Sequence, residues 1–500
     1  MKNAKKKIVC VMTVLSMCIF LLSSCSSETS NNDGVNADIV SDNDGRSIGE
    51  TLDEELKDNL PDIDFDGETI NVVEHDRSDQ SFILAEIFSE GEDGDLINDT
   101  IYRRNLLLEE RFNIKINTIR NNNVGGTVQN AVLANDKSYD VVIGPIIALR
   151  GLYTNNLLLD LNTLPHVEFQ QPWWDQRATQ DFSIANKLFI NVGASNITAN
   201  YYTWAVLFNK ALVSENAMDM PYQSVRDGSW TLDKMYNMMK EINPRDLNGD
   251  GAMDEHDFWG MCNEFYNTGA FFVGAGEKLF QKNGDDIPYL SMNTQRGIEV
   301  LNKIFDIVYD KNATISAEDY SGKYGNPWFE VLYPVFMQDR SLFFVSGMHT
   351  IPEIKEMDSD FGILPMPKYD EEQKEYYNTM TIHGVMVQGV PLTNDKLEAT
   401  GVFLESLAFE SHKTVVPAYY ETAMKYKLLR DDESIEMLEI ISKSRIFDLG
   451  YIYNWGGALD IYTNLTSSNS RDFVSAYERA AERILRDMER GVVAILGLEE

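Results

Sequence analysis

The spacing of apolar residues changes repeatedly between residues 66 and 145, and it predicts strands that alternate with helices. Short apolar runs predict three strands, ETINVVEH, IKINTIR and YDVVIG. Apolar residues three or four positions apart predict two intervening helices, NDTIYRRNLLLEERF and VGGTVQNAVLAND, and Asn98 or Asp99 is expected to cap the first. This alternation predicts a parallel sheet that is covered by helices on both faces.

Candidate ligand residues stand at the ends of two of these strands. In parallel sheets of this kind, ligands bind beyond the carboxyl ends of the strands. His75 and Asp76 come at the end of the first strand, and Gly144 and Pro145 at the end of the third. We therefore expect a binding site at this edge of the sheet.

The rest of the chain keeps the mixed character. Further strands are predicted for NKLFINVG, YYTWAVLFN, SLFFVSG, FGILPMPKY and GVMVQGVPL. Helices are predicted through most of residues 209–340 and through residues 401–500. The fold class predicted from the pattern is α/β.

The first 25 residues have the pattern of an export signal. The positive segment MKNAKKK precedes the apolar segment IVCVMTVLSMCIFLL, which is too short for a permanent membrane span. The segment LSSC ends at Cys25 and resembles the lipobox of bacterial lipoproteins. That resemblance implies that residues 1–24 are removed as a signal peptide and that Cys25 carries lipid such as palmitate. An ordinary secretory signal is the alternative.

Composition refines this view of the chain. Residues 25–65 are polar, acidic and poor in aromatic side chains, which predicts a flexible tether. The formal charge of −36 argues against binding to nucleic acid or to anionic lipid, because both need clustered Lys and Arg. After removal of residues 1–24 only Cys25 and Cys262 remain, so no internal disulfide is expected.

The segment DLNGDGAMDEHD, residues 246–257, has the ligand spacing of a twelve-residue calcium loop. Gly251 stands sixth, where the turn needs a residue that tolerates positive φ. An Asp at the twelfth position and the lack of a predicted second helix argue against a calcium sensor, so we expect a structural Ca²⁺ ion. Its expected ligands are Asp246, Asn248, Asp250, the carbonyl of Ala252, Asp254 and Asp257.

Aromatic residues gather in QQPWWDQ, NYYTWAVLFN and YIYNWGG, near predicted strand ends and loops. A sugar offers an apolar face to flat rings and hydroxyls to polar side chains, so such clusters favour a sugar site. Core packing is the alternative for each ring. The residues expected to stack on a ligand are Trp174, Tyr202, Trp204 and Trp455, and those expected to orient hydroxyls are Asp76 and Asn200.

Motifs of common enzyme classes are absent from the sequence. It contains no phosphate-binding loop ending in Gly-Lys-Ser/Thr, no GxGxxG after the first strand and no HExxH. The chain has 79 Asp and Glu residues, so the sequence neither nominates nor excludes the carboxylate pair of a glycoside hydrolase. A surface-tethered glycoside hydrolase therefore stays open as an alternative.

Several segments, in their order along the chain, resemble the extracellular solute-binding proteins of bacterial ABC importers, in the carbohydrate-associated family similar in plan to maltose-binding protein. They are LSSC, YDVVIG, LLLDLNTL, WAVLFNKALV, WTLDKMYNMMKEI, the DxNGDG loop, FGILPMPKYDEEQKEYY and VVPAYYE. The resemblance implies two α/β lobes joined by a hinge, with a ligand cleft between them. It implies a first lobe at residues 66–192 with 361–411, and a second at 197–357 with 412–500.

The resemblance also implies a site and a role. Met348 and His349 stand where many sugar-binding relatives place a Trp against the ligand, and residues 200–204 precede LFNK, as cleft residues do in the family. It implies a monomeric, non-enzymatic protein, anchored by lipid on the extracellular face of the cell membrane or on a membrane face toward the periplasm. Such a protein captures a solute, here expected to be an oligosaccharide, and delivers it to an ABC permease. A ligand-sensing partner of a membrane kinase is an alternative that the sequence leaves open.

Overall fold

The computed structural model describes residues 56–76, 86–425 and 432–497 of the 500-residue chain. The chain divides into two compact units, residues 1–57 and 58–500, and all the elements below lie in the second unit. The expected signal peptide, Cys25 and nearly all of the expected tether lie outside the described residues. None of the helices in the described part is long and apolar enough to cross a membrane.

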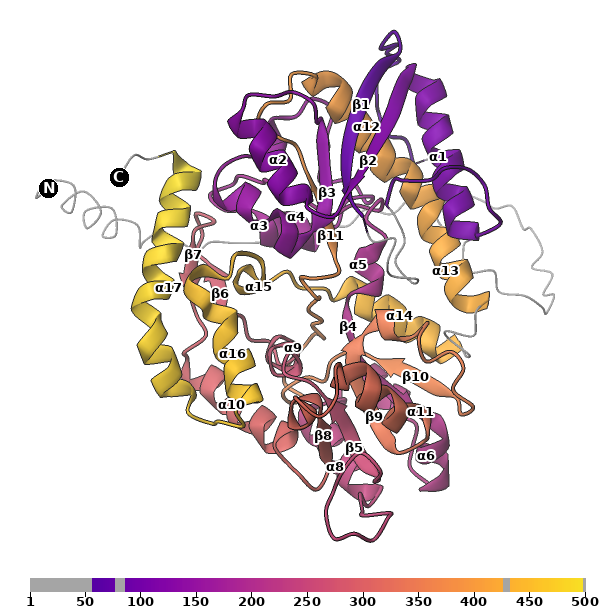
Figure 1. Cartoon of the computed structure of the whole chain (residues 1–500), viewed down its shortest axis with the longest axis vertical. Coiled ribbons are helices and arrows are strands. Elements are labelled where there is room, and N and C mark those ends of the chain that lie inside the picture. The colour runs from indigo at the N-terminus through magenta and orange to yellow at the C-terminus, as the bar shows by residue number, and fades with distance from the viewer. Residues whose placement is uncertain (1–55, 77–85, 426–431, 498–500) are drawn as a thin grey trace, which may run out of the picture. The chain divides into compact units, whose positions relative to one another are not determined.

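A four-stranded sheet has the strand order β11-β3-β1-β2 (Figure 1). Its strands are β1 (Glu68–His75), β2 (Ile114–Asn121), β3 (Val141–Pro145) and β11 (Met386–Gly389). β1 pairs in parallel with β2 and β3, whereas β11 runs antiparallel to β3. The three strands predicted first from the sequence and their parallel pairing are confirmed.

Helices cover this first sheet. They include α1 (Leu96–Phe112), α2 (Val124–Leu133), α3 (Ile146–Thr154), α12 (Leu397–Lys413) and α13 (Val415–Lys425). Asp95 caps α1 and accepts hydrogen bonds from the amides of Ile97 (3.0 Å) and Asn98 (2.9 Å). The expected cap at Asn98 or Asp99 was therefore wrong, because the free amides of the first turn lie nearer the amino end of the segment.

A five-stranded sheet has the order β10-β4-β9-β5-β8. Its strands are β4 (Trp204–Asn209), β5 (Trp259–Asn263), β8 (Thr314–Ser316), β9 (Ser341–Gly347) and β10 (Phe361–Leu364). β5 runs parallel to β8 and β9, whereas β4 runs antiparallel to β9 and β10. Every residue of these five strands is buried, which explains their nearly continuous apolar character.

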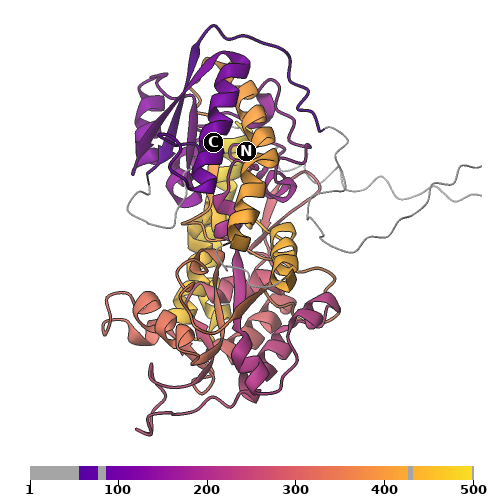
Figure 2. The same cartoon turned by 90° about the vertical axis from the view of Figure 1, so that its right-hand side faces the viewer.

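Two expected lobe boundaries need correction. Residues 361–411 were expected in the first lobe, but β10 pairs with β4 in the second sheet, where its four buried residues complete the edge. The chain returns to the first sheet only at β11, more than twenty residues later. Residues 412–500 were expected in the second lobe, but α13 packs on α1 beside the first sheet (Figure 2). The reason is a buried apolar cluster that Val415 and Tyr419 of α13 form with Ile97 and Ile101 of α1.

The remaining elements connect and cover the two sheets. They are η1 (Leu161–Thr163), α4 (Gln176–Phe182), α5 (Thr198–Tyr201), α6 (Lys210–Glu215), α7 (Tyr222–Arg226), α8 (Leu232–Glu241), α9 (Asn267–Gly274), the β6 (Phe280–Lys282) and β7 (Pro288–Leu290) hairpin, α10 (Gln295–Val308), η2 (Ala317–Tyr320), the π-helix η3 (Trp328–Leu332), α11 (Tyr333–Met337), η4 (Met348–Thr350), α14 (Asp432–Lys443), α15 (Leu449–Tyr453), η5 (Trp455–Gly457), α16 (Ala458–Ser467) and α17 (Phe473–Leu496).

Candidate functional site

Three parallel strands of the second sheet, β5, β8 and β9, end at one edge, here called the second-sheet edge. The residues that follow them are 264–266, 317–318 and 348–350. The antiparallel strand β4 begins at the same edge, because Trp204 pairs with Gly347. Segments distant in sequence therefore bring their side chains together where ligands of parallel sheets bind.

A row of rings lies along this edge. The imidazole of His349 stacks on Tyr202, with ring centroids 4.8 Å apart, and lies 5.6 Å from the ring of Trp328. Trp328 packs edge-on against Tyr333 at 4.8 Å. The indole nitrogen of Trp328 is buried and has no hydrogen-bond partner among the described residues. The row thus combines apolar ring faces with an unused donor, which is the combination that a sugar ring requires.

A second pair of rings follows β5. Phe265 and Tyr266 lie with centroids 4.1 Å apart, and the Tyr266 hydroxyl is 3.1 Å from Nε2 of His383. Both side chains are half-buried. Phe265 and Tyr266 were not among the residues expected from the sequence.

The loop of residues 381–385 positions Tyr202 and connects it with the first sheet. A Cβ on Gly384 would lie 1.9 Å from the Tyr202 ring, so the ring packs directly on the glycine backbone. The amide of Thr381 donates to the carbonyl of Tyr202 (2.9 Å). At the other end of the loop, the Val385 carbonyl accepts a bond from the amide of Ile146 (3.2 Å), the first residue of α3.

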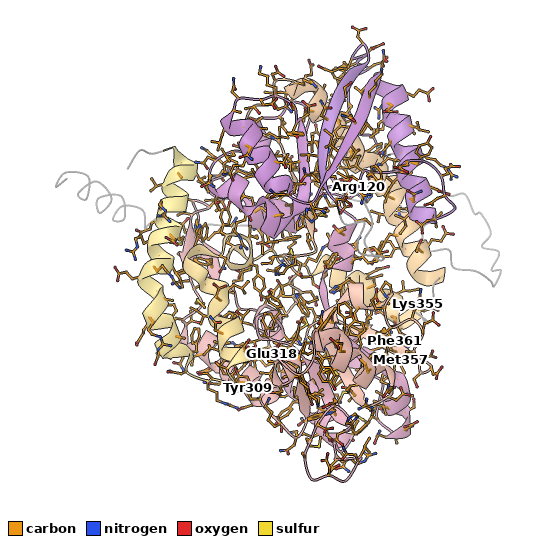
Figure 3. The ribbon with its side chains drawn as sticks, in the orientation of Figure 1. Arg120, Tyr309, Glu318, Lys355, Met357 and Phe361 are labelled. Carbon is orange, nitrogen blue, oxygen red and sulfur yellow. The ribbon has the colours of Figure 1, made fainter. Side chains whose placement is uncertain are left out.

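Two carboxyl groups stand beside the rings. Glu264 follows β5, and Glu318 follows β8, its register neighbour (Figure 3 labels Glu318). The amide of Phe265 donates to Oε1 of Glu318 (3.0 Å). Burial, and after it the charge of Glu318, raises the pKa of Glu264 to about 8. Burial also raises the pKa of Glu318.

The expected residues of the first sheet lie at its carboxyl edge. His75 ends β1, and Asp76 follows it. The Asp76 carboxylate forms an ion pair of 2.6 Å with Arg120 of β2, which lies over the ring of Phe88 (Figure 3 labels Arg120). Asp76 therefore lies where the strand pattern predicted it, with its charge already balanced by a protein group.

Two buried carboxylates connect this edge with the segment that leads into β4. Glu74 accepts hydrogen bonds from the amides of Ile87 (3.3 Å) and Phe88 (2.9 Å). Glu86 accepts from the amides of Ile197 (2.7 Å) and Thr198 (3.2 Å) and from the Thr198 hydroxyl. Burial raises the pKa of Glu86 to about 8. Residues 86–88 are thereby joined both to β1 and to the start of α5, four residues before Tyr202.

Some expected ligand residues lie elsewhere. The indole N–H of Trp174 donates to Glu405 (2.9 Å) inside the core, and Asn200 accepts a bond from Arg445 (2.8 Å). Trp455 is buried in a stack with Tyr453. The structure does not bring these three to the second-sheet edge. Tyr202 and His349 do lie in the ring row there, and Trp204 and Met348 stand at the same edge with buried side chains.

The expected calcium loop follows α8 and is closed by mutual backbone hydrogen bonds between Arg245 and Phe258. Asp257 is fully buried and accepts bonds from the amides of Leu247 (2.8 Å) and Asp254 (2.7 Å). Hydrogen bonds from backbone amides, that of Gly251 first, lower the pKa of Asp246. Of the other expected ligands, Asn248, Asp250 and Ala252 are exposed and Asp254 is half-buried.

The donor set of this loop suits a hard cation, since it consists of oxygens alone. Gly251 has the positive φ of +88° that its sixth position needs. The described residues contain no group of three or more His, Cys, Asp or Glu side chains already gathered around one metal position. Calcium binding therefore stays a prediction from the sequence.

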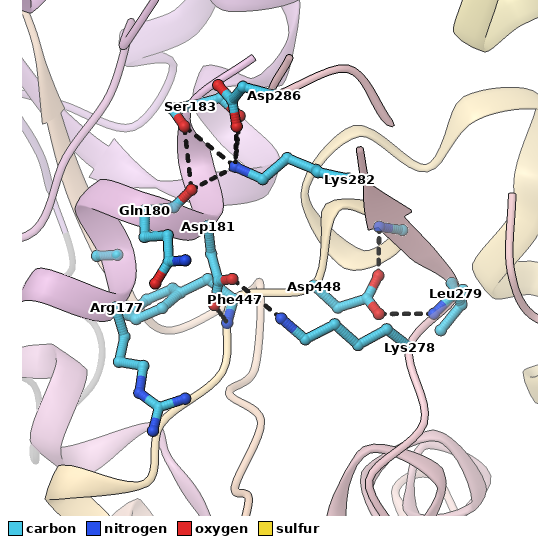
Figure 4. A network of polar contacts seen from close by, with 12 residues as sticks. Arg177, Gln180, Asp181, Ser183, Lys278, Leu279, Lys282, Asp286, Phe447 and Asp448 are labelled. Carbon is cyan, nitrogen blue, oxygen red and sulfur yellow. Dashed lines mark hydrogen bonds and ion pairs between the residues drawn. The ribbon is translucent and has the colours of Figure 1, made fainter. Parts of the chain in front are cut away.

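A separate cavity of about 370 Å³ lies between α4, β6 and residues 446–449 (Figure 4). Lys278 donates to Asp181 (3.0 Å), whose second oxygen accepts the amide of Phe447 (3.0 Å). Asp448 accepts the amides of Leu279 and Gly450, each at 2.6 Å. These inward polar groups are paired with the protein itself, so the cavity is a structural junction rather than the first candidate for a ligand site.

No protein-family model matches the chain, and no curated protein sequence matches it. Solved structures do. A cyclo/maltodextrin-binding protein complexed with maltotetraose is 13% identical, with a TM-score of 0.56, over 85% of this chain and 97% of that one. The GacH receptor of Streptomyces glaucescens, solved unliganded and with acarbose, is 13% identical, with a TM-score of 0.52, over 84% and 99%. UspC of M. tuberculosis is 11% identical, with a TM-score of 0.54, over 83% and 99%.

These similarities extend over nearly the full length of the compared proteins, and they bear on the fold. They agree with the two sheets and the segments that cross between them. The chain therefore has the two-lobed α/β fold of these solved structures.

Proposed function

We propose that this protein is a solute-binding protein that captures an oligosaccharide at the second-sheet edge and delivers it to an ABC permease. The observation that carries the proposal is the row of Tyr202, His349 and Trp328, with its unused indole donor, on this fold. Proteins of similar structure were solved with acarbose and with maltotetraose.

The mechanism follows from the segments that connect the lobes. Ligand shifts an equilibrium between conformations by its different affinity for each, and a two-lobed fold closes by dihedral changes in a few connecting residues. The loop of residues 381–385 packs on Tyr202 at Gly384 and is hydrogen-bonded at Val385 to the start of α3, which follows β3 of the first sheet. A ligand on Tyr202 would therefore be linked to the first sheet through this loop. No bond of the ligand is made or broken.

Binding is tested by the thermal midpoint of the purified protein with a panel of oligosaccharides. A ligand at 100 times its dissociation constant adds about 2.7 kcal/mol to stability. Trp328→Ala should abolish the shift, whereas Glu330→Gln, at an exposed position of the same π-helix, controls for general damage to η3. Because Glu264 and Glu318 form a carboxyl pair, the sugar is also recovered; cleaved sugar would establish a glycoside hydrolase instead.

We propose further that lipid on Cys25 holds the protein on the outer face of the membrane and that the protein acts as a monomer. The LSSC segment supports the anchor. Cys25→Ala should release the protein from washed membranes, and retention of the variant there would refute the anchor. Sedimentation in detergent measures the oligomeric state.

We also propose that residues 246–257 bind Ca²⁺ as a structural ion. The loop spacing and its all-oxygen donor set support this. Asp246, Asn248, Asp250, Asp254 and Asp257 would hold the ion with the carbonyl of Ala252. When bound, it would offset the repulsion between these side chains.

A further inference from the structure

The carboxyl pair of the second-sheet edge lacks a positive partner. Within the described part of the chain, no hydrogen bond or ion pair reaches the Glu264 carboxyl, and Oε2 of Glu318 is buried without a hydrogen-bond partner. Lys311, a base whose charge acts on Glu318, forms an ion pair of 2.5 Å with Asp319. Two neighbouring acids without a bonded base repel one another when both are ionised, so Glu264 keeps its proton at neutral pH, and a bound cation can take the place of that proton.

The surrounding groups add to this negative field. The charges of Glu264 and Asp460 both act on the Tyr266 hydroxyl, and those of Glu353 and Glu264 both act on the Tyr333 hydroxyl. A neutral hydroxyl can donate a hydrogen bond to a carboxylate, but it leaves the charge in place. A cation removes the repulsion and gains a charge-assisted hydrogen bond as well.

The adjacent aromatic rings also favour a positively charged ligand. Phe265 and Tyr266 directly follow Glu264, and Trp328 lies in the ring row. The faces of aromatic rings carry negative potential and attract ammonium groups. The walls and the carboxyl groups of the site therefore favour the same sign of ligand charge.

A hydroxyl group without a hydrogen-bond partner lies against helix α9, which follows the ring pair in the chain. The hydroxyl of Tyr451 is buried, with the side chain 5% exposed, and has no hydrogen-bond partner among the described residues. It lies against Gly269, in the first turn of α9, where a Cβ would approach it to 2.0 Å. This turn begins directly after Tyr266, so a buried hydroxyl without a partner adjoins the carboxyl and ring cluster.

We infer that the ligand of this site carries an ammonium group, held between Glu264 and Glu318 and against the rings of Phe265 and Tyr266, which makes its class the amino sugars. The inference rests on the proposed function, since it names the ligand class of the same site. It rests on the juxtaposition of two unbalanced carboxyl groups with aromatic walls.

The test compares tetrasaccharides that share a β-1,4 linkage and differ at the second carbon. Glucosamine carries an ammonium group there, N-acetylglucosamine an acetamide and glucose a hydroxyl; maltotetraose is a neutral sugar of other linkage. Calorimetry with the purified protein measures each affinity at low and high salt. We expect the glucosamine tetramer to bind at least about 10-fold more tightly than any neutral sugar, and the preference to shrink as salt rises.

Variants assign the preference to the carboxyl pair. Glu264→Gln and Glu318→Gln should each weaken glucosamine binding roughly 10- to 100-fold, as expected for a lost hydrogen bond to a charged group. Glu371→Gln changes the net charge equally at an exposed position and should leave the affinity unchanged.

The outcomes separate this inference from the proposed function. Neutral sugars that bind as tightly as the glucosamine tetramer overturn the inference and leave the proposed function standing. A glucosamine preference that survives both Glu→Gln changes also overturns it. Failure of every sugar in the panel to bind overturns both.

Discussion

Replacing Glu264 by Gln should stabilise the protein while it removes a ligand contact. Burial and the charge of Glu318 raise the pKa of Glu264 from 4.5 to about 8. Between these two pH values the unfolded chain loses the proton and the folded chain keeps it. Unfolding then releases a proton, so stability falls as pH rises through this window. Gln keeps the shape of the protonated acid and cannot ionise.

The magnitude follows from the width of the window. Each pKa unit corresponds to about 1.36 kcal/mol. Keeping Glu264 protonated in the folded protein at pH 7, well above its unfolded pKa, therefore lowers the free energy of unfolding of the parent by about 3 kcal/mol. The side chain is half-buried, and solvent reduces that figure, so we expect Glu264→Gln to gain about 1–3 kcal/mol at pH 7. Below about pH 3.5 both states hold the proton, and the variant and the parent should have equal stability.

Urea unfolding at a series of pH values measures this difference directly. Glu371→Gln, at an exposed position, is the matched control and should follow the parent at every pH. A Glu264→Gln variant less stable than the parent at pH 8, or a difference that stays constant between pH 5 and pH 8, would show that the folded protein does not suppress ionisation of Glu264.

Three further predictions concern other parts of the molecule. About millimolar Ca²⁺ should raise the thermal midpoint of the parent and not that of Asp246→Asn, and equal shifts would exclude the loop as the site. Glu86→Ala leaves the amides of Ile197 and Thr198 without their acceptor and should lower the free energy of unfolding by about 2–4 kcal/mol; an unchanged urea midpoint would contradict this. Gly384→Ala should displace Tyr202 and weaken oligosaccharide binding at least about tenfold, so calorimetry with unaltered affinity would refute the packing argument.

The first sheet could be predicted from sequence because its signals are local. ETINVVEH coincides with β1 at both ends, since β-branched residues fill the run and Gly67 precedes it with a positive φ of +79°. The placement of β10 could not be predicted in the same way. Its four residues are equally apolar, and only pairing with β4, about 150 residues earlier in the chain, assigns them to the second sheet.

The same contrast applies to the candidate site. Trp174 and Tyr202 both stand in aromatic clusters, but Trp174 is fixed in the core by Glu405, which lies 231 residues away in sequence. Glu264 gave no signal of its own, because it is one of 79 acids. Its significance comes from the register of β5 with β8, which brings Glu318 beside it. One local clue was present: Glu264 directly follows the buried run WGMCN.

Two independent connections from the first sheet converge on the segment that carries Tyr202. Glu86 fixes the amides of residues 197 and 198, and the loop of residues 381–385 packs Gly384 on the Tyr202 ring. A ligand that moves the Tyr202 ring must therefore also move a group bonded to the first sheet, or else break both the packing on Gly384 and the hydrogen bonds to Glu86. Because the Val385 carbonyl is bonded to Ile146 at the start of α3, the loop transmits displacement through the backbone rather than through flexible side chains. In the proposed function, these short covalent and hydrogen-bonded segments would couple occupancy of the second-sheet edge to the position of the first lobe.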